Sequence, residues 1–247
     1  MQKRILKTIL SNISIVITAA GSSTRMGSGI KKEYLPLKNG TVLSNCAKTF
    51  LKTTVKSCKL KNLVITYPKK QLKDAEKALF CDKEFEKLLQ KLNIQLYFVE
   101  GSDTRQSSVF NAIKFLNNGD KKPDYVLIHD GARPFVTEKI IFDVINAAIE
   151  AGGSVCGVSP TDTIKEIDES GMITKHLKRQ SLISVQTPQG FEFDTLYEAH
   201  CSALKDNIEY TDDTQVFGAY GKLVKVVPGD INNIKITYPG DLERGLK

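Results

Sequence analysis

The residues best suited to chemistry follow the first strongly apolar run of the chain, residues 13–17. Small residues come next, and Arg25 and Lys32 lie shortly beyond them in the loop Thr18-Ala19-Ala20-Gly21-Ser22-Ser23 and its continuation. Small side chains let backbone N–H groups close round a polyphosphate, since no bulky substituent blocks its approach. The two cations place fixed positive charge where phosphate charge would lie.

This loop lacks the glycine spacing of the dinucleotide-binding fingerprint and of the P-loop. It therefore indicates a nucleotide, but neither a dehydrogenase nor a P-loop ATPase. The alternative is a plain connection from strand to helix, in which small residues only permit close packing.

A second group of polar residues follows another apolar run, at His129, Asp130 and Arg133. A carboxylate that ends a buried strand beside a phosphate loop is well placed to hold Mg²⁺, which prefers oxygen ligands and bridges phosphates. The alternative is an ion pair between Asp130 and Arg133 that braces the turn, and the two roles are compatible. We interpret His129 as a packing or hydrogen-bonding residue and not as a base.

Two further segments carry polar side chains. Asp103 and Ser108 flank a turn that opens a helix and could contact a base or ribose, with Arg105 bracing the loop; a simple helix cap is the alternative. Lys235 lies between apolar residues at alternating positions, which places it in a cleft or at a solvated strand edge.

The elements that would position these segments alternate between strand and helix through the first two-thirds of the chain. Apolar periodicity predicts strands at 13–17, 62–67, 94–99, 124–129 and 154–159, and helices at 42–51, 69–92, 105–117 and 137–151. This alternation is typical of an α/β fold with a mainly parallel, twisted, Rossmann-like sheet. Ligands of such sheets bind at the carboxyl ends of the strands, where every segment described above lies.

The alternation stops after Pro160. Residues 163–186 read as two extended arms joined by a turn, which is either a dimerisation arm or a surface excursion. Helices near 194–206, from Thr211 and from Pro239, with a strand at 223–227, complete the chain. We find no linker and predict one domain over residues 1–247.

Composition excludes several classes of protein. The net charge is +7, but lysines alternate with acidic residues along predicted helices, so a solvated surface explains them better than a nucleic-acid track. Five cysteines without a C-x-x-C pair favour reduced core thiols and a cytoplasmic protein. No apolar stretch is long enough for a membrane span. Only six of the 35 basic residues are arginines, and four of them lie in the segments with chemical character, namely Arg25, Arg105, Arg133 and Arg179.

Taken together, these motifs resemble the 2-C-methyl-D-erythritol 4-phosphate cytidylyltransferases of the non-mevalonate isoprenoid pathway. The resemblance covers nearly the whole chain in order. Its motifs are Ala19-Ala20-Gly21 to Arg25-Met26-Gly27, Lys32, Arg105 with Ser108-Val109, His129-Asp130 with Ala132-Arg133-Pro134-Phe135, Asp162-Thr163, Gln186-Thr187-Pro188-Gln189 and Asn233-Ile234-Lys235-Ile236-Thr237. It implies transfer of CMP from CTP to methylerythritol phosphate, with Mg²⁺ and pyrophosphate release, by a homodimer whose hairpin arms embrace.

The resemblance also implies roles for single residues. Arg25 and Lys32 would stabilise the transition state at the α-phosphate, while Arg179 and Lys235 would position the attacking phosphate. The acceptor pocket would include Arg133, Thr163 and Thr211. The nucleotide side would comprise Ala19, Ala20, Gly21, Asp103, Ser108 and Asp130, with Asp130 as the metal ligand. Two departures from the common pattern, Ser102 and Gly131, put detail at the base and ribose in doubt.

The residue types suit this chemistry, since a phosphate monoester is already a nucleophile and needs no Ser–His or Cys–His apparatus. Alignment of two polyanions and neutralisation of their charge are what the reaction requires. Two alternatives stay open at this stage. One is a ribitol-5-phosphate cytidylyltransferase, and the other is a non-catalytic basic module that binds nucleotides or RNA.

Overall fold

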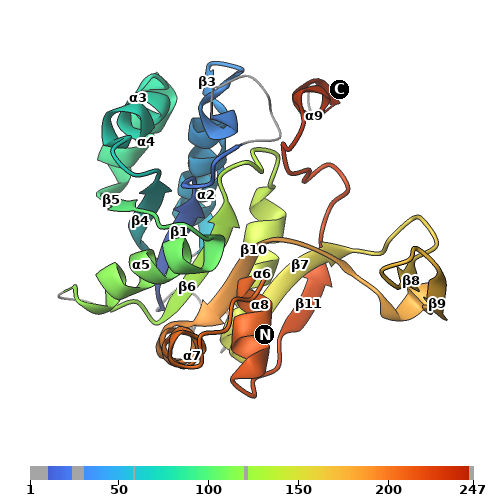
Figure 1. The fold of residues 1–247 in the computed structure, drawn as a ribbon. Coiled ribbons are helices and arrows are strands. Elements are labelled where there is room, and N and C mark those ends of the chain that lie inside the picture. Colours follow the sequence, from blue (N-terminus) through green and yellow to red (C-terminus); the bar gives the residue numbers. More distant parts are fainter. Residues whose placement is uncertain (1–10, 24–30, 58, 120–121, 245–247) are drawn as a thin grey trace.

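The computed structural model describes residues 11–23, 31–57, 59–119 and 122–244, and it centres on a seven-stranded sheet (Figure 1). The strands follow the order β11-β7-β10-β6-β1-β4-β5. Their bounds are β1 Asn12–Thr18, β4 Lys59–Tyr67, β5 Gln95–Glu100, β6 Tyr125–Asp130, β7 Gly153–Val158, β10 Ser184–Glu192 and β11 Lys225–Pro228. All neighbours pair in parallel except β10, which runs antiparallel to both β6 and β7. The predicted α/β fold with a mainly parallel sheet is confirmed.

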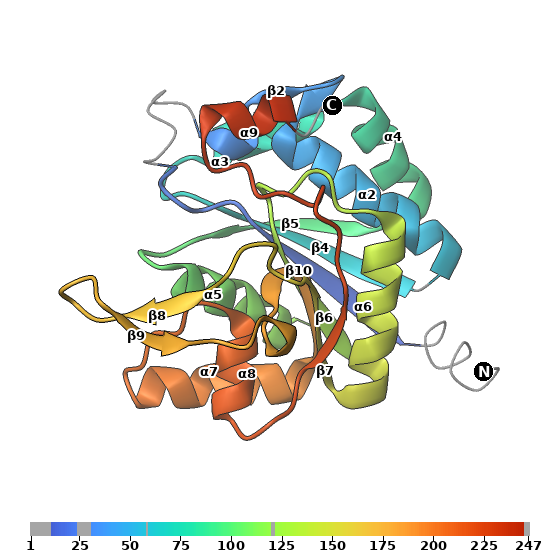
Figure 2. The same ribbon diagram turned by 90° about the vertical axis from the view of Figure 1, so that its right-hand side faces the viewer.

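Helices cover both faces of the sheet, as Figure 2 shows. One face carries α2 (Val42–Ser57), α3 (Leu72–Phe80), α4 (Lys83–Leu92) and α6 (Glu138–Ala151); the other carries α5 (Arg105–Asn117), α7 (Phe193–Lys205) and α8 (Asp213–Ala219). Strand β1 serves both layers, because Ile15 and Ile17 join the first core while Val16 joins the second. This alternation fixes the register of β1 and thereby the position of the loop that follows it.

Two differences from the sequence prediction have clear causes. The helix predicted over residues 69–92 is two helices, because Asp82 caps the start of α4 by accepting hydrogen bonds from the backbone N–H groups of Glu84 (3.0 Å) and Phe85 (3.2 Å). Strand β10 was not predicted, since Pro188 interrupts it and proline is rare inside a central strand. Its register with β7 shifts between Val185 and Gln189, so residues around Pro188 leave the ladder and turn toward the neighbouring loops.

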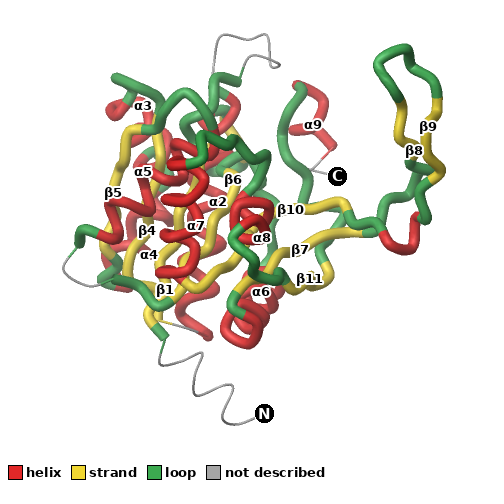
Figure 3. The backbone as a smooth tube through the Cα atoms, turned by 60° about the horizontal axis from the view of Figure 1, so that its bottom comes forward, coloured by secondary structure: helices red, strands yellow, loops and turns green. Residues whose placement is uncertain are grey.

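The hairpin predicted in residues 163–186 is present and projects from the sheet (Figure 3). Its strands are β8 (Lys165–Ile167) and β9 (Ile173–His176), which pair antiparallel. A short 3₁₀ helix, Arg179–Ser181, follows, and β10 begins at Ser184, so the last residues of the predicted arm belong to the central sheet. We call β8, β9 and the residues between them the arm.

The remaining elements are short, namely β2 (Pro36–Leu37), β3 (Gly40–Thr41), a 3₁₀ helix at Lys32–Tyr34 and the terminal α9 (Pro239–Arg244). No helix in the described part of the chain is long and apolar enough to cross a membrane. Four described cysteines are free thiols; Cys46 and Cys156 are buried as predicted, but Cys81 is exposed and Cys201 half-buried. The prediction that the cysteines lie in the core is therefore confirmed for Cys46 and Cys156 and is wrong for Cys81.

Candidate active site

A cavity of about 970 Å³ opens at the carboxyl ends of the parallel strands. Its walls come from the loops after β1, β4, β5 and β6 and from the segment around Lys235. This is the position that the strand order predicts for a ligand. Seven of the predicted site residues line it, namely Ala20, Gly21, Lys32, Asp103, Ser108, Asp130 and Lys235.

Asp130 ends strand β6 and is the electrostatic centre of this cavity. Its Oδ2 lies 2.9 Å from Nζ of Lys235 and 3.3 Å from Nε of Arg133. Its Oδ1 lies 3.7 Å from Nε of Arg105. Burial alone would raise the pKa of Asp130, but Lys235, Arg105 and Arg133 together bring that pKa well below its usual range. The site therefore holds a permanent negative charge inside a ring of cations.

The ion pair between Asp130 and Arg133 is thus confirmed, and it is part of a larger network. Arg133 also donates from Nη1 to the backbone oxygen of Asn233 (2.7 Å), which ties the turn after β6 to the segment that carries Lys235. The side-chain Nδ2 of Asn233, which is fully buried, donates to the backbone oxygen of Thr187 (3.0 Å). Sequence reasoning assigned no role to Asn233 or Thr187, although both belong to motifs of the resemblance. Only the interrupted strand β10 explains why they meet.

Thr187 also orders the end of β6 and fixes the state of His129. Its hydroxyl accepts a hydrogen bond from the backbone N–H of Asp130 (3.0 Å) and donates to Nδ1 of His129 (3.0 Å). Nε2 of His129 then donates to the backbone oxygen of Arg133 (3.2 Å). Both ring nitrogens are used in hydrogen bonds and the side chain is fully buried, so His129 is a structural residue and not a base.

His129 gives the fold a dependence on pH. Burial lowers the pKa of His129 from 6.5 to about 4. Between these values the unfolded chain takes up a proton that the folded chain refuses, so the free energy of unfolding decreases as pH falls. We expect a loss of roughly 2 kcal/mol between about pH 7 and pH 4.5, measured by urea unfolding. His129→Gln should be less stable at neutral pH but lack this part of the slope; equal slopes in both proteins would contradict the assignment.

On the nucleotide side, two loops approach very closely. A Cβ atom on Gly101 would lie 2.2 Å from Cβ of Ala20 and 2.9 Å from Oγ of Ser108, so only glycine permits this contact. Ser108 is buried and braces the loop after β5, accepting from the backbone N–H of Ser102 (2.9 Å) and donating to the backbone oxygen of Thr104 (2.8 Å). Asp103 lines the cavity beside it. Ala19 is buried behind the wall, where its N–H donates to Oγ1 of Thr66 (3.0 Å).

Of the two cations predicted for the phosphate loop, Lys32 is described and lies in the cavity wall with 9% of its surface exposed. Its backbone N–H donates to Oγ of Ser23 (3.3 Å), which connects the two ends of the loop. The hydroxyl of Ser23 donates to Oε2 of Glu33 (3.4 Å), and this oxygen also forms an ion pair with Nζ of Lys31 (3.2 Å). Arg25 lies outside the described residues, and its role stays a prediction.

Four residues predicted for the acceptor side lie outside the lining of this cavity. Thr163 and Arg179 are exposed on the two sides of the arm, where Nη1 of Arg179 donates to the backbone oxygen of Thr161 (2.9 Å). Thr211 is exposed just before α8 and donates from Oγ1 to Oε1 of Gln215 (3.1 Å). Arg133 is also outside the lining, but its contact with Asp130 places it directly behind the wall.

The described residues thus combine a cavity of the size that small-molecule ligands occupy with a ring of cations, an arrangement suited to nucleotidyl transfer. Comparison with known proteins decides the family. The family model of 2-C-methyl-D-erythritol 4-phosphate cytidylyltransferase (IspD) matches residues 13–245. The chain belongs to this family.

Curated relatives agree over almost the whole chain. The 2-C-methyl-D-erythritol 4-phosphate cytidylyltransferase of Clostridium novyi is 41% identical over 238 residues, which cover 96% of each chain. That of Bacillus cereus is 38% identical over 231 residues, covering 93% of this chain and 94% of the relative.

Solved structures agree as well. The 4-diphosphocytidyl-2C-methyl-D-erythritol synthase of Anaerococcus prevotii superposes with a TM-score of 0.78 at 28% identity, covering 98% of this chain and 96% of that one. The cytidylyltransferase of Thermus thermophilus gives 0.71 at 28% identity, covering 95% and 97%. As a member of this cytidylyltransferase family, the chain is a nucleotidyltransferase that transfers CMP from CTP to 2-C-methyl-D-erythritol 4-phosphate.

Proposed function

We propose that the transfer proceeds by direct attack of the acceptor phosphate on CTP. An oxygen of methylerythritol phosphate forms a bond to the α-phosphorus, the bond from that phosphorus to the bridging oxygen breaks, and pyrophosphate leaves. The observation that carries this proposal is the cationic ring around Asp130 in a cavity lined by the phosphate loop. Such fixed charges stabilise the charge that builds up during phosphoryl transfer without reorganising.

Pyrophosphate release tests the substrate assignment. We expect release with CTP and methylerythritol phosphate, and little with CTP and ribitol 5-phosphate. Faster release with ribitol 5-phosphate would overturn the choice of acceptor. No release with either acceptor, together with RNA affinity that falls steeply with salt, would favour the non-catalytic alternative.

Within this reaction the chain's residues divide into two groups. Lys32, with Arg25, would contact the phosphates of CTP, while Ala20, Gly21, Asp103 and Ser108 would hold the nucleoside end. Lys235 also lines the cavity and would meet the acceptor phosphate. Its ion pair with Asp130 fixes its ammonium group before either substrate binds.

We propose Mg²⁺ as the cofactor. No cluster of three or more His, Cys, Asp or Glu side chains suited to a metal occurs among the described residues. Asp130 nevertheless fits an ion that is bound mainly through its substrate, because Lys235 and Arg133 approach its Oδ2, whereas its Oδ1 lies 3.7 Å from Nε of Arg105. Mg²⁺ commonly uses one or two carboxylates together with substrate phosphates. When bound, the ion would neutralise charge on the triphosphate.

We also propose that the active form is a homodimer in which each arm completes the site of the partner subunit. Arg179 and Thr163 lie beside the arm and outside the cavity of their own subunit. The arm exposes large apolar side chains, with Ile167, Met172 and Ile173 each more than half exposed. A surface of this kind on a projecting hairpin is suited to contact with a second copy.

Complementation between two inactive variants tests this arrangement. Lys32→Ala removes a cavity residue, and Arg179→Ala removes a residue beside the arm. If Arg179 acts in the partner's site, each mixed dimer regains one intact site, and a re-equilibrated equal mixture recovers about a quarter of wild-type activity. If Arg179 acts within its own subunit, no activity returns. The control is each variant re-equilibrated alone at the same total concentration.

We further propose a cytoplasmic location, supported by the free thiols of all described cysteines. The whole of residues 1–247 is proposed to act as one nucleotidyltransferase domain, since the single central sheet carries every wall of the cavity.

A further inference from the structure

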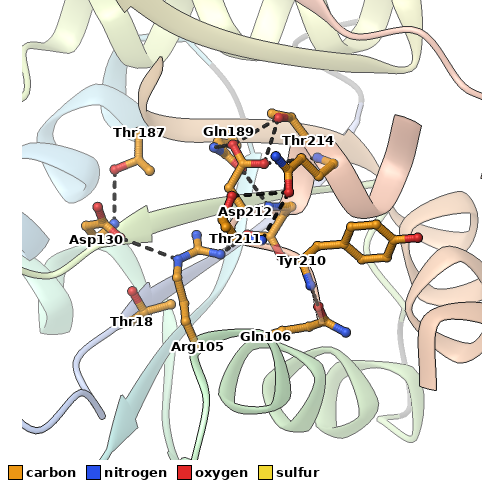
Figure 4. Close-up of polar contacts among 12 residues, drawn as sticks. Thr18, Arg105, Gln106, Asp130, Thr187, Gln189, Tyr210, Thr211, Asp212 and Thr214 are labelled. Carbon is orange, nitrogen blue, oxygen red and sulfur yellow. Dashed lines mark hydrogen bonds and ion pairs between the residues drawn. The ribbon is translucent and has the colours of Figure 1, made fainter. Parts of the chain in front are cut away.

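Arg105, the first residue of α5, connects two buried carboxylates. Its Nη1 donates to Oδ2 of Asp213 at 2.7 Å, and its Nε lies 3.7 Å from Oδ1 of Asp130. Asp130 in turn holds Lys235. The planar guanidinium presents separate nitrogens to the two carboxylates in a fixed geometry, whereas a lysine has a single charged nitrogen. Figure 4 shows Arg105 between Asp130 on one side and the segment that opens α8 on the other.

Asp213 is a rigid anchor for this arginine. Its side chain is fully buried, and its Oδ1 accepts a hydrogen bond from Nε2 of His200 (3.2 Å). Its backbone N–H donates to Oε1 of Gln189 (3.2 Å), in strand β10. Burial alone would raise the pKa of Asp213, but Arg105 and His200 lower it, so the anchor stays charged. The position of Arg105 is therefore set from behind the site.

The neighbouring Gln106 holds the same segment by its backbone. Its Nε2 donates to the oxygen of Ile208 (3.0 Å), and its Oε1 accepts from the N–H of Tyr210 (2.6 Å). Residues 208–213 thus attach to the start of α5 at three points. Thr211, which the family resemblance assigns to the acceptor pocket, lies within this segment.

We propose that Arg105 and Gln106 are positioning residues for the acceptor side of the reaction. Held by Asp213, Arg105 places its positive charge 3.7 Å from Asp130, which in turn pairs with Lys235, while Gln106 fixes the segment that carries Thr211. The inference rests on the proposed function of Lys235 and Thr211. It assigns to the start of α5 a role in aligning the acceptor phosphate, in addition to the contacts that the adjacent loop makes with the nucleotide cavity.

The test compares Arg105→Lys, Asp213→Asn and their double variant in steady-state kinetics and in CTP binding by calorimetry. We expect Arg105→Lys to lower kcat by about 10-fold to 100-fold, because small misplacements of reacting groups cost this much. The KM for methylerythritol phosphate should rise about tenfold, and the Kd of CTP should change less than about threefold. The double variant should be no worse than the more impaired single variant, since both changes break one connection.

Gln106→Met provides an independent test, because it removes both hydrogen bonds to residues 208–210 and leaves the contact between Arg105 and Asp213. It should raise the acceptor KM and leave CTP binding unchanged. The control is Glu150→Gln, which removes an exposed ion pair with Lys225 (3.0 Å) outside the cavity lining. It should change neither the acceptor KM nor CTP binding. If Asp213→Asn fails to fold, Arg105→Lys, which keeps the positive charge, tests by itself whether Arg105 positions the acceptor side.

Three results would overturn the proposal. These are unchanged acceptor kinetics in Arg105→Lys, additive losses in the double variant, and a rise in the Kd of CTP as large as the rise in the acceptor KM. Failure of the proposed function is distinguishable, because the wild-type protein would then release no pyrophosphate from CTP and methylerythritol phosphate.

Discussion

Lys32→Ala is expected to lower kcat by about 10²–10³, the usual loss when one fixed donor to a developing charge is removed. Lys32 lies in the cavity wall next to the phosphate loop, and it is the first residue of a short 3₁₀ helix, Lys32–Tyr34. The substitution should leave the fold intact, since Lys32 is not part of either hydrophobic core. The measurement is pyrophosphate release at saturating substrates, together with Tm.

Lys73→Ala is the matched control for this prediction. Lys73 is exposed on α3 and outside the cavity lining, so the same change of residue type should leave kcat unaltered. Arg25→Ala is expected to behave like Lys32→Ala, on the strength of the family resemblance. Near-normal turnover in both Lys32→Ala and Arg25→Ala would refute the assignment of phosphate-binding roles.

Asp130→Asn should produce the largest loss of stability among the site variants. It leaves Lys235, Arg133 and Arg105 without their shared counter-charge in a partly buried site. Removing one member of a buried ion pair is strongly destabilising, and we expect the free energy of unfolding to fall by about 2–4 kcal/mol. We place the value toward the lower end because Lys235 and Arg105 keep contact with solvent, with 37% and 26% of their side chains exposed.

Urea unfolding with and without CTP checks this prediction. The phosphates of CTP would supply the missing negative charge, so CTP should raise the free energy of unfolding of Asp130→Asn more than that of the wild type. Asp143→Asn, which disrupts an exposed pair with Lys139 on α6, is the control and should cost less than about 1 kcal/mol. An Asp130→Asn protein as stable as the wild type would show that the carboxylate does not organise the cationic ring.

The contrast between β1 and β10 shows where sequence reasoning succeeded and where it stopped. Strand β1 is a continuous apolar run, buried on both faces, and the chain around it follows the local rules for a strand and a loop. Strand β10 contains Pro188 and an interrupted register, and its residues enter the sheet between two strands that come earlier in the chain. Long-range pairing of this kind leaves no local pattern to detect.

The same distinction applies to the site. Lys32, Asp103, Ser108, Asp130 and Lys235 could be proposed from sequence, because strand order brings the ends of parallel strands to one edge. Of the partners of Asp130, Arg133 could be proposed as well, but Arg105 and Lys235 could not, since they are far from Asp130 along the chain and meet it only through tertiary packing. Asp213 illustrates this most clearly: a cap-like aspartate in a first helical turn has a sufficient local explanation, and only its 2.7 Å contact with Arg105 shows otherwise.

The sequence by itself determined the α/β class, the position of the ligand site and, through motifs spread over the chain, the family. These properties follow from periodicity and from residue types at the ends of strands, which are local features. The tertiary structure alone decided that Asp130 is the centre of a cationic ring, that both ring nitrogens of His129 are used in hydrogen bonds, and that Arg179 lies outside the lining of the cavity. Charge interactions and burial depend on distances between segments far apart in sequence, and only the folded chain sets those distances.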